Sequence, residues 1–300
     1  MQAKMKAAAR SVAGCAMAAA LAAGVWGAAA AAPAGGRQTR ELPPLAPHEA
    51  VYALSLADGR GRFASAGGEV AYSYAGDACA GYDFRLRQEL ELEPHEGEPV
   101  KLGVVARTAE DAAGARLRFR QATVRGQGEA ELVEGSARRT GGAGEAPGLA
   151  VSLTAPQAKR LAFSGEILFP AAYTRRLLAA ARAGERTMAA RLYEPGENGE
   201  TVYDVFAVIG PRAPAGPGRK TGEAGRRAGL DRLDRWPVTV SYYGPGPGER
   251  TPEYSVAFDL YDNGVSGDMR LNLGEVSLDA KLTGLKVTGD GRCAAAARRK

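Results

Sequence analysis

Apolar and polar residues alternate with a period of two along several stretches of this chain. The clearest stretch lies between Tyr82 and Glu93, where most alternate positions are aromatic or aliphatic and most positions between them are charged. A period of two places one set of side chains on each face of a β-strand, so this stretch predicts a strand with one solvated face. Shorter stretches repeat the pattern at 70–74, 116–120, 254–260, 269–273 and 276–282.

This alternation is typical of antiparallel sheets, because the strands of parallel sheets are buried on both faces and are continuously apolar. Asp262, Asn263 and Gly264 separate two of the alternating stretches and favour the positive φ angles of a tight turn, so residues 254–273 are predicted to form a hairpin. We expect about twelve to fifteen strands, since a chain of this size divides into about that many strands of ordinary length.

One segment has helical spacing instead. Apolar residues recur on one face across 170–183, at Tyr173, Leu177, Leu178 and Ala181. Pro170 stands at the start of this segment and Gly184 directly follows it, which are the residues preferred at the two ends of a helix. We predict one amphipathic helix whose apolar face packs on the sheet, with a partner-binding helix as the alternative.

The first 32 residues differ from the rest in charge and composition. Lys4, Lys6 and Arg10 precede an uncharged, alanine-rich run, which is typical of a secretory signal peptide cleaved near Ala32. Residues 33–300 are then predicted to form a single β-rich domain in the periplasm. A retained membrane anchor is one alternative. Lipidation of Cys15 is another, although Cys15 precedes most of the apolar run.

Gly- and Pro-rich segments interrupt the alternation at 141–148, 211–229 and 244–248, and the second is long enough to be a flexible loop within the domain. The net charge is +5, and it falls to about +2 without residues 1–32, which hold three cations and no acid. Paired basic residues occur at 138–139, 226–227 and 298–300. We interpret these as solvated loops and a tail, so no nucleic-acid partner is predicted.

Removal of residues 1–32 leaves two cysteines, Cys79 and Cys293. In an oxidising compartment a disulfide between them is the simplest outcome, and two free structural thiols are the alternative. Together with His48 and His95, these cysteines lack the spacing of metal ligands, so neither a metal site nor a cofactor is predicted.

Catalytic motifs are absent from the sequence. There is no G-x-S-x-G elbow, phosphate-binding loop or H-E-x-x-H pair. His48 and His95 each follow a proline, where a surface or capping histidine is expected, and the acidic residues of the strands are expected on the solvated face. No catalytic residue is therefore proposed, and the chain is predicted not to be an enzyme.

The chain resembles the EipB-like envelope-integrity family of periplasmic proteins from alphaproteobacteria. The resemblance rests on segments in the same order over most of the chain after residue 32: 45–52 (LAPHEAVY), 79–82 (CAGY), 168–170 (LFP), 236–242 (WPVTVSY), 260–265 (LYDNGV) and the late Cys293. The sequence departs from the family pattern at Glu49 and Ala53, where a basic and an acidic residue are expected.

This resemblance implies a strongly curved, spiral-like antiparallel sheet, a disulfide between Cys79 and Cys293, and a non-enzymatic role in maintaining the cell envelope. Two functions fit such a protein. The favoured one is binding of a periplasmic protein segment or peptide by sheet edges and an apolar concavity. The alternative is a carrier of lipid or lipopeptide. The sequence identifies neither the ligand-binding residues nor the oligomeric state.

Overall fold

The computed structural model describes residues 42–58, 61–142, 144–196, 198–216, 221–246 and 251–293. The predicted leader, Cys15 and the basic residues 298–300 lie outside these described residues. Among the described residues, no helix is both long and apolar enough to cross a membrane.

Fourteen strands of the described residues form one antiparallel sheet, which confirms the predicted class and strand number. The first eight are β1 (His48–Leu56), β2 (Phe63–Asp77), β3 (Gly81–Pro94), β4 (Val100–Glu110), β5 (Arg116–Arg125), β6 (Glu131–Thr140), β7 (Gly148–Ala155) and β8 (Lys159–Ser164). The remaining six are β9 (Thr187–Tyr193), β10 (Val202–Ile209), β11 (Arg235–Tyr243), β12 (Tyr254–Tyr261), β13 (Ser266–Asn272) and β14 (Ser277–Val287). Helices α2 (Pro170–Ala183) and α3 (Glu223–Arg227) and the 3₁₀ turn η2 (Leu230–Arg232) complete the described elements.

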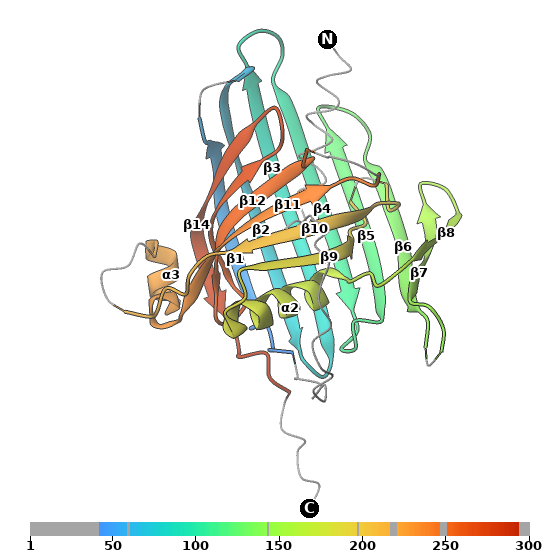
Figure 1. Ribbon diagram of the computed structural model, residues 1–300. Helices are drawn as coiled ribbons and strands as arrows, with labels where there is room; N and C mark the ends of the chain where they lie inside the picture. The colour runs from blue at the N-terminus through green and yellow to red at the C-terminus, as the bar shows by residue number, and fades with distance from the viewer. Residues whose placement is uncertain are drawn as a thin grey trace, which may run out of the picture.

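The chain runs outwards from β1 in the middle of the sheet to β8 at one edge, and then inwards from β9 at the other edge to β14. The strand order is β8-β7-β6-β5-β4-β3-β2-β1-β14-β13-β12-β11-β10-β9, so every strand pairs with a neighbour in sequence except at the seam between β1 and β14. The two edge strands, β8 and β9, are joined by α2 and do not pair with each other. Instead, Leu168 in the connecting segment forms a parallel bridge with Leu192 of β9. The sheet is therefore strongly curved but open, and α2 crosses its concave side (Figure 1).

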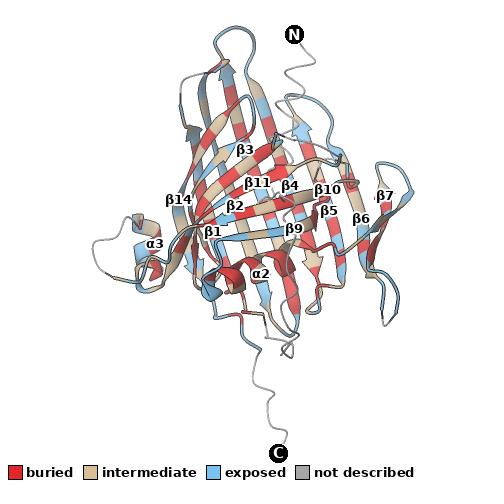
Figure 2. Ribbon diagram, in the orientation of Figure 1, coloured by how far each residue is buried: buried red, intermediate tan, exposed pale blue. Residues whose placement is uncertain are grey.

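The period-two pattern of the sequence becomes the two faces of this sheet. Along β3, Leu86 and Leu90 are buried while Arg85 and Arg87 are exposed. Figure 2 shows the same alternation of buried and exposed positions along most strands. The predicted hairpin is formed by β12 and β13, and Gly264 in its turn has φ +84° and donates its N–H to the Tyr261 carbonyl at 2.8 Å.

The buried side chains form a large cluster and a smaller one. The large cluster fills the curve between β1–β4, β10–β14 and the inner face of α2. The smaller cluster lies between β5–β7, the segment just before α2 and the ends of β9 and β10, and it includes Phe119, Phe169 and Tyr193. The region of the sheet near β8 is therefore held by packing across the concave side as well as by strand pairing.

Helix α2 has the predicted bounds and is fixed at both ends. Its first amides donate to a side chain of β4, described below, and Gly184 ends it with φ +80°. From its middle, Arg175 donates to the carbonyls of Leu42 and Pro43, both at 2.9 Å. Near its end, Arg182 donates to Asp262 at the β12–β13 turn. The helix thus ties the entering chain and a distant turn to the sheet.

Two paired basic segments that we interpreted as loops are parts of regular elements. Arg138 and Arg139 belong to β6, and Arg226 and Arg227 belong to α3. The loop interpretation was wrong for both pairs, because neighbouring Gly and Ala residues were taken as signs of a loop although they occupy positions in or beside these elements. Helix α3 also lies within 211–229, the Gly- and Pro-rich segment in which the sequence predicted a flexible loop.

Cys79 and Cys293 are joined by a disulfide, with their Cα atoms 5.3 Å apart. Cys79 lies in the turn between β2 and β3, and Cys293 follows β14. Beside the disulfide, the Ala78 N–H donates to the Gly291 carbonyl at 3.0 Å. The bond therefore fastens the segment after β14 to the β2–β3 turn.

Candidate functional site

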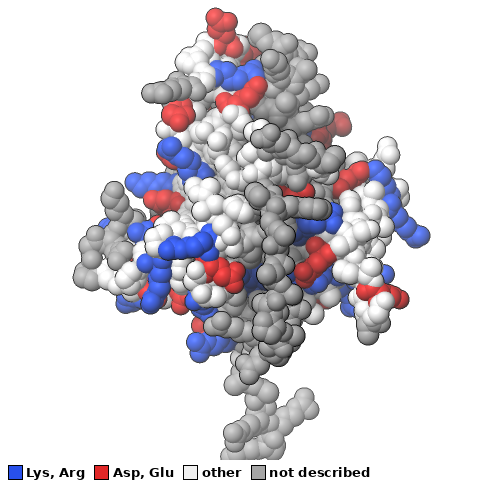
Figure 3. Space-filling model, in the orientation of Figure 1, with Lys and Arg blue, Asp and Glu red and all other residues white. Residues whose placement is uncertain are grey.

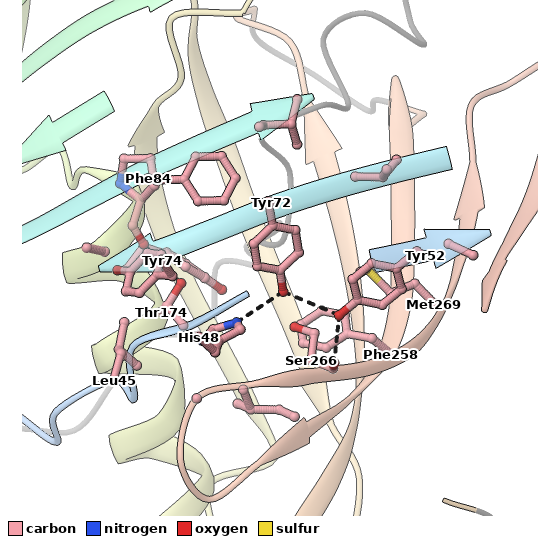
Figure 4. A pocket seen from close by; sticks show the side chains of 18 of the residues that line it. Leu45, His48, Tyr52, Tyr72, Tyr74, Phe84, Thr174, Phe258, Ser266 and Met269 are labelled. Carbon is pink, nitrogen blue, oxygen red and sulfur yellow. Dashed lines mark hydrogen bonds between the residues drawn. The ribbon is translucent and has the colours of Figure 1, made fainter. Parts of the chain in front are cut away.

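A cavity of about 160 Å³ lies between the concave face of the sheet and helix α2. Its wall is mainly aromatic and aliphatic and comes from β1–β4, β12–β14 and α2 (Figure 4). Tyrosines contribute much of the aromatic surface, at Tyr52, Tyr72, Tyr74, Tyr82 and Tyr173. Tyr72 stacks on Tyr52, and Tyr74 stacks on Tyr82, so the rings hold one another in place.

A row of polar groups crosses this apolar wall (Figure 4). The His48 Nδ1 lies 2.7 Å from the Ala46 carbonyl oxygen, and its Nε2 lies 3.3 Å from the Tyr72 hydroxyl. The Tyr72 hydroxyl lies 3.3 Å from the Tyr52 hydroxyl, which donates to the Ser266 carbonyl at 2.8 Å. Three strands, β1, β2 and β13, therefore contribute to one hydrogen-bonded row.

Burial keeps the side chains of this row neutral. It lowers the pKa of His48, with the hydrogen bond to Ala46 opposing the shift, and it raises the pKa of Tyr72 to about 12 and that of Tyr52 well above its usual value. Because a carbonyl only accepts, neutral His48 carries its proton on Nδ1 and accepts at Nε2. His48, Tyr72 and Tyr52 then supply one N–H or O–H proton each, three in all, for the four contacts of the row. One acceptor is left over, and it can take an N–H or O–H from a bound molecule.

Glu110 lines another part of the cavity, at the end of β4. It is buried, and its two carboxylate oxygens accept the N–H groups of Ala171 and Ala172 at 2.8 and 2.9 Å. Burial raises its pKa to about 7, although the two amides and Arg175 oppose the shift. A carboxylate at a helix N-terminus satisfies amides that have no partner within the helix. Glu110 therefore joins the wall of the cavity to the start of α2.

The position of Glu110 corrects a sequence prediction. Acidic residues of the strands were expected on the solvated face, and Glu110 is on the inner one. The amides of α2 supply the partners that allow a carboxylate to be buried there, and no sequence pattern reports such a partner.

The two histidines considered in the sequence lie in different surroundings. A surface or capping position was expected for His48; the surface position is wrong, because His48 is buried at the start of β1 and lines the cavity. His95 is exposed just after β3. His48 pairs with Tyr74 and Pro94 pairs with Phe63, so the two histidines lie near opposite ends of β2, about 35 Å apart. The fold does not bring them together.

Sequence patterns do not identify the cavity tyrosines as a site. Alternation correctly placed Tyr72 and Tyr74 on the apolar face, but that pattern does not distinguish a core tyrosine from one that lines a cavity. The proline before His48 likewise suggested a surface turn rather than a buried ring.

One group of possible metal ligands occurs among the described residues, at Asp77, Cys79 and Cys293, whose ligand atoms lie within 4.8 Å of one another. The two sulfurs form the disulfide and supply no thiolate. The Asp77 carboxylate accepts the backbone N–H groups of Cys79 and Ala80 at 2.7 and 2.8 Å. This group is explained by the turn that it stabilises.

Comparison with known proteins agrees with this architecture. A Brucella abortus (strain 2308) protein named cell envelope integrity protein EipB is 27% identical over 262 residues, which cover 86% of this chain and 90% of that protein. A crystal structure described as a β-barrel-like protein of a domain of unknown function, DUF1849, from Brucella abortus superposes with a TM-score of 0.73 at 27% identity, covering 82% of this chain and 99% of that one. The EipB-like family model matches residues 39–289, which include every strand of the sheet, the cavity and helix α2. By sequence and by fold, the chain therefore belongs to the EipB-like family.

Proposed function

We propose that this chain supports the integrity of the cell envelope as a non-enzymatic binding protein of the periplasm, and that its cavity binds an apolar or aromatic side chain together with the adjacent backbone of a protein segment or peptide. Family membership and the name of the Brucella relative support the envelope role. The chemistry of the cavity supports the choice of ligand.

The surplus acceptor in the row from His48 to Ser266 is the observation that carries this choice. A peptide backbone supplies N–H donors, whereas the hydrocarbon part of an acyl chain supplies none. A backbone N–H that pairs with the row would take up the one acceptor that is left over, which favours binding. The tyrosine rings around the row would contact the apolar side chain of the same segment.

The volume of the cavity points in the same direction. An apolar cavity of about 150 Å³ holds a single benzene ring, and pockets that enclose drug-sized molecules are about 300–1,000 Å³. At about 160 Å³, this cavity matches one side chain better than a whole lipid. Its largely apolar wall nevertheless makes a lipid or lipopeptide the second candidate. Mass spectrometry of lipid that remains bound to protein purified from envelopes would test that candidate directly.

The proposal is tested by filling the cavity. Ala280 lines it from β14, and Ala280→Leu adds three carbon atoms to that wall. The next residue, Lys281, is exposed on the other face of the strand, so Lys281→Leu is the matched control. In a strain that lacks the gene, we expect the control to restore resistance to envelope stress and Ala280→Leu to fail, with both variants folded and equally abundant.

Photo-cross-linking from a cavity position in intact envelopes identifies the ligand. A peptide or protein adduct that disappears in Ala280→Leu supports the proposal. Full complementation by stable Ala280→Leu would contradict the cavity as the binding site, and a lipid adduct without any protein adduct would favour the second candidate.

A further inference from the structure

The outer face of strands β5–β8 carries an excess of positive charge. Its outward-facing positions hold five arginines, all exposed, and Glu134 is the one acid among the outward positions of these four described strands. The five are Arg116, Arg118, Arg120, Arg138 and Arg160. We call these residues the arginine face. On the face seen in Figure 3, Lys and Arg are interspersed with Asp and Glu.

Strand register places these arginines close together. Arg116 lies directly opposite Arg138. Arg118 is two residues from Arg116 on the same strand. Arg118 pairs with Ser136 on β6, Ser136 pairs with Ser152 on β7, and Ser152 pairs with Arg160 on β8. Adjacent strands are about 4.8 Å apart, so Arg118 and Arg160 are about 14 Å apart across three strand spacings. The small residues between them leave the guanidinium groups accessible.

Four of these arginines have no acidic partner among the described residues. Arg120 pairs with Glu134, and on the neighbouring strands Arg107 pairs with Asp83. Within the part of the chain that the structure describes, no carboxylate lies within 4 Å of the guanidinium groups of Arg116, Arg118, Arg138 or Arg160. Like charges directly opposite each other on neighbouring strands destabilise a sheet. The stability of the fold therefore does not explain the arginine face.

A row of exposed and half-buried apolar side chains borders the arginine face. Val105 of β4 lies opposite Ala122 of β5, which lies opposite Leu132 of β6. The Val105 side chain is 61% exposed, and Val124, two residues beyond Ala122, is 36% exposed. These are two of the three large apolar residues that are exposed in the described structure. Exposed apolar groups beside basic groups make one continuous amphipathic surface.

We propose that this outer face of β4–β8 docks on the surface of an anionic phospholipid membrane. Guanidinium groups form paired hydrogen bonds with phosphate oxygens, and basic residues near an anionic membrane are attracted to its negative surface potential. Apolar side chains beside them can enter the boundary between headgroups and acyl chains. The surface is separate from the cavity, so membrane docking and ligand binding are independent properties of the molecule.

Vesicle co-sedimentation tests this proposal with the purified chain recovered from cells that express the full-length sequence. We expect binding to vesicles of phosphatidylcholine that contain phosphatidylglycerol, little binding to phosphatidylcholine alone, and loss of binding as salt is raised. Each arginine near an anionic surface contributes about fivefold to partitioning, so the double variant Arg118→Gln/Arg138→Gln is expected to bind roughly thirtyfold more weakly. Val105→Ser is expected to lower binding several-fold at low salt, where the unmodified protein binds, because it removes an exposed apolar side chain.

The control is the double variant Arg227→Gln/Arg292→Gln, which removes the same charge from exposed positions on α3 and after β14. It is expected to bind as the unmodified protein does, and thermal unfolding confirms that both double variants are folded. Equal binding to neutral vesicles, or equal losses in the two double variants, would overturn the proposal. Binding to polyglutamate without binding to vesicles would also overturn it, in favour of an acidic protein partner.

Discussion

Glu194, directly after β9, is the most enclosed acidic side chain among the described residues, with 1% of its surface exposed. Its Oε2 accepts the Tyr254 hydroxyl at 2.9 Å, and within the described structure its Oε1 has no hydrogen-bond partner. Burial raises its pKa to about 8, and the hydrogen bond from Tyr254 opposes that shift only in part. The native protein therefore holds this proton more tightly than the unfolded chain does.

This carboxyl makes stability depend on pH. Because its native pKa of about 8 exceeds the ordinary value of 4.5, its contribution is complete below pH 4.5 and is lost as the pH rises through 8. Between pH 6.5 and 8.5 we expect the free energy of unfolding to fall by about 2 kcal/mol because of Glu194. Denaturant titrations at both pH values should show this fall in the unmodified protein and little of it in Glu194→Gln.

The choice of pH window separates this effect from that of His48. The native pKa of His48 is lowered, so its contribution to stability is present above the ordinary value of 6.5 and is lost as the pH falls. Glu110, with a pKa of about 7, adds a smaller decline within the same window. An unchanged pH dependence in Glu194→Gln would contradict the assignment to Glu194.

At the scale of elements, the end of α2 depends on one backbone conformation. Gly184 has φ +80°, and a Cβ added there would meet nothing within 4 Å. A side chain therefore fits in space but disfavours the left-handed conformation, and Gly184→Ala is expected to lower the free energy of unfolding by about 1 kcal/mol. Gly103→Ala is the control, since Gly103 has an ordinary strand conformation and equally open space. Equal stabilities of the two variants in denaturant titrations would refute this account.

Local patterns predicted the elements well and the site poorly, for a physical reason. Periodicity, Pro170 and Gly184 report the environment and backbone of nearby residues, so β3, the β12–β13 hairpin and α2 were predictable. The cavity depends on contacts between β1, β2, β13 and α2, which are distant in sequence. No local pattern shows that Glu110 accepts the amides of α2, or that Arg138 of β6 faces outwards opposite Arg116 of β5.

At the scale of the whole molecule, the disulfide spans 214 positions of the sequence but joins neighbouring parts of the sheet. Its stabilising effect comes mainly from restricting the unfolded chain. Cys79→Ser, Cys293→Ser and the double variant are each expected to lower the free energy of unfolding by about 2–5 kcal/mol and to melt at similar temperatures, because each removes the same bond. A double variant that melts like the unmodified protein, or two free thiols in unfolded, non-reduced protein, would contradict this.

The seam between β1 and β14 also determines the order of events when the chain folds. All other strand pairs join neighbours in sequence, so their pairing closes short loops. Almost all of the sheet's chain lies between β1 and β14, so their pairing closes a very long loop and is slow to form. One edge of β1 therefore stays open until β14 arrives, exposing backbone groups that attract other strands. Pulse-labelled hydrogen exchange should find the seam amides protected after those between β3 and β6, and simultaneous protection would exclude this order. A newly made chain is thus most prone to aggregation at the place that becomes the centre of the finished sheet.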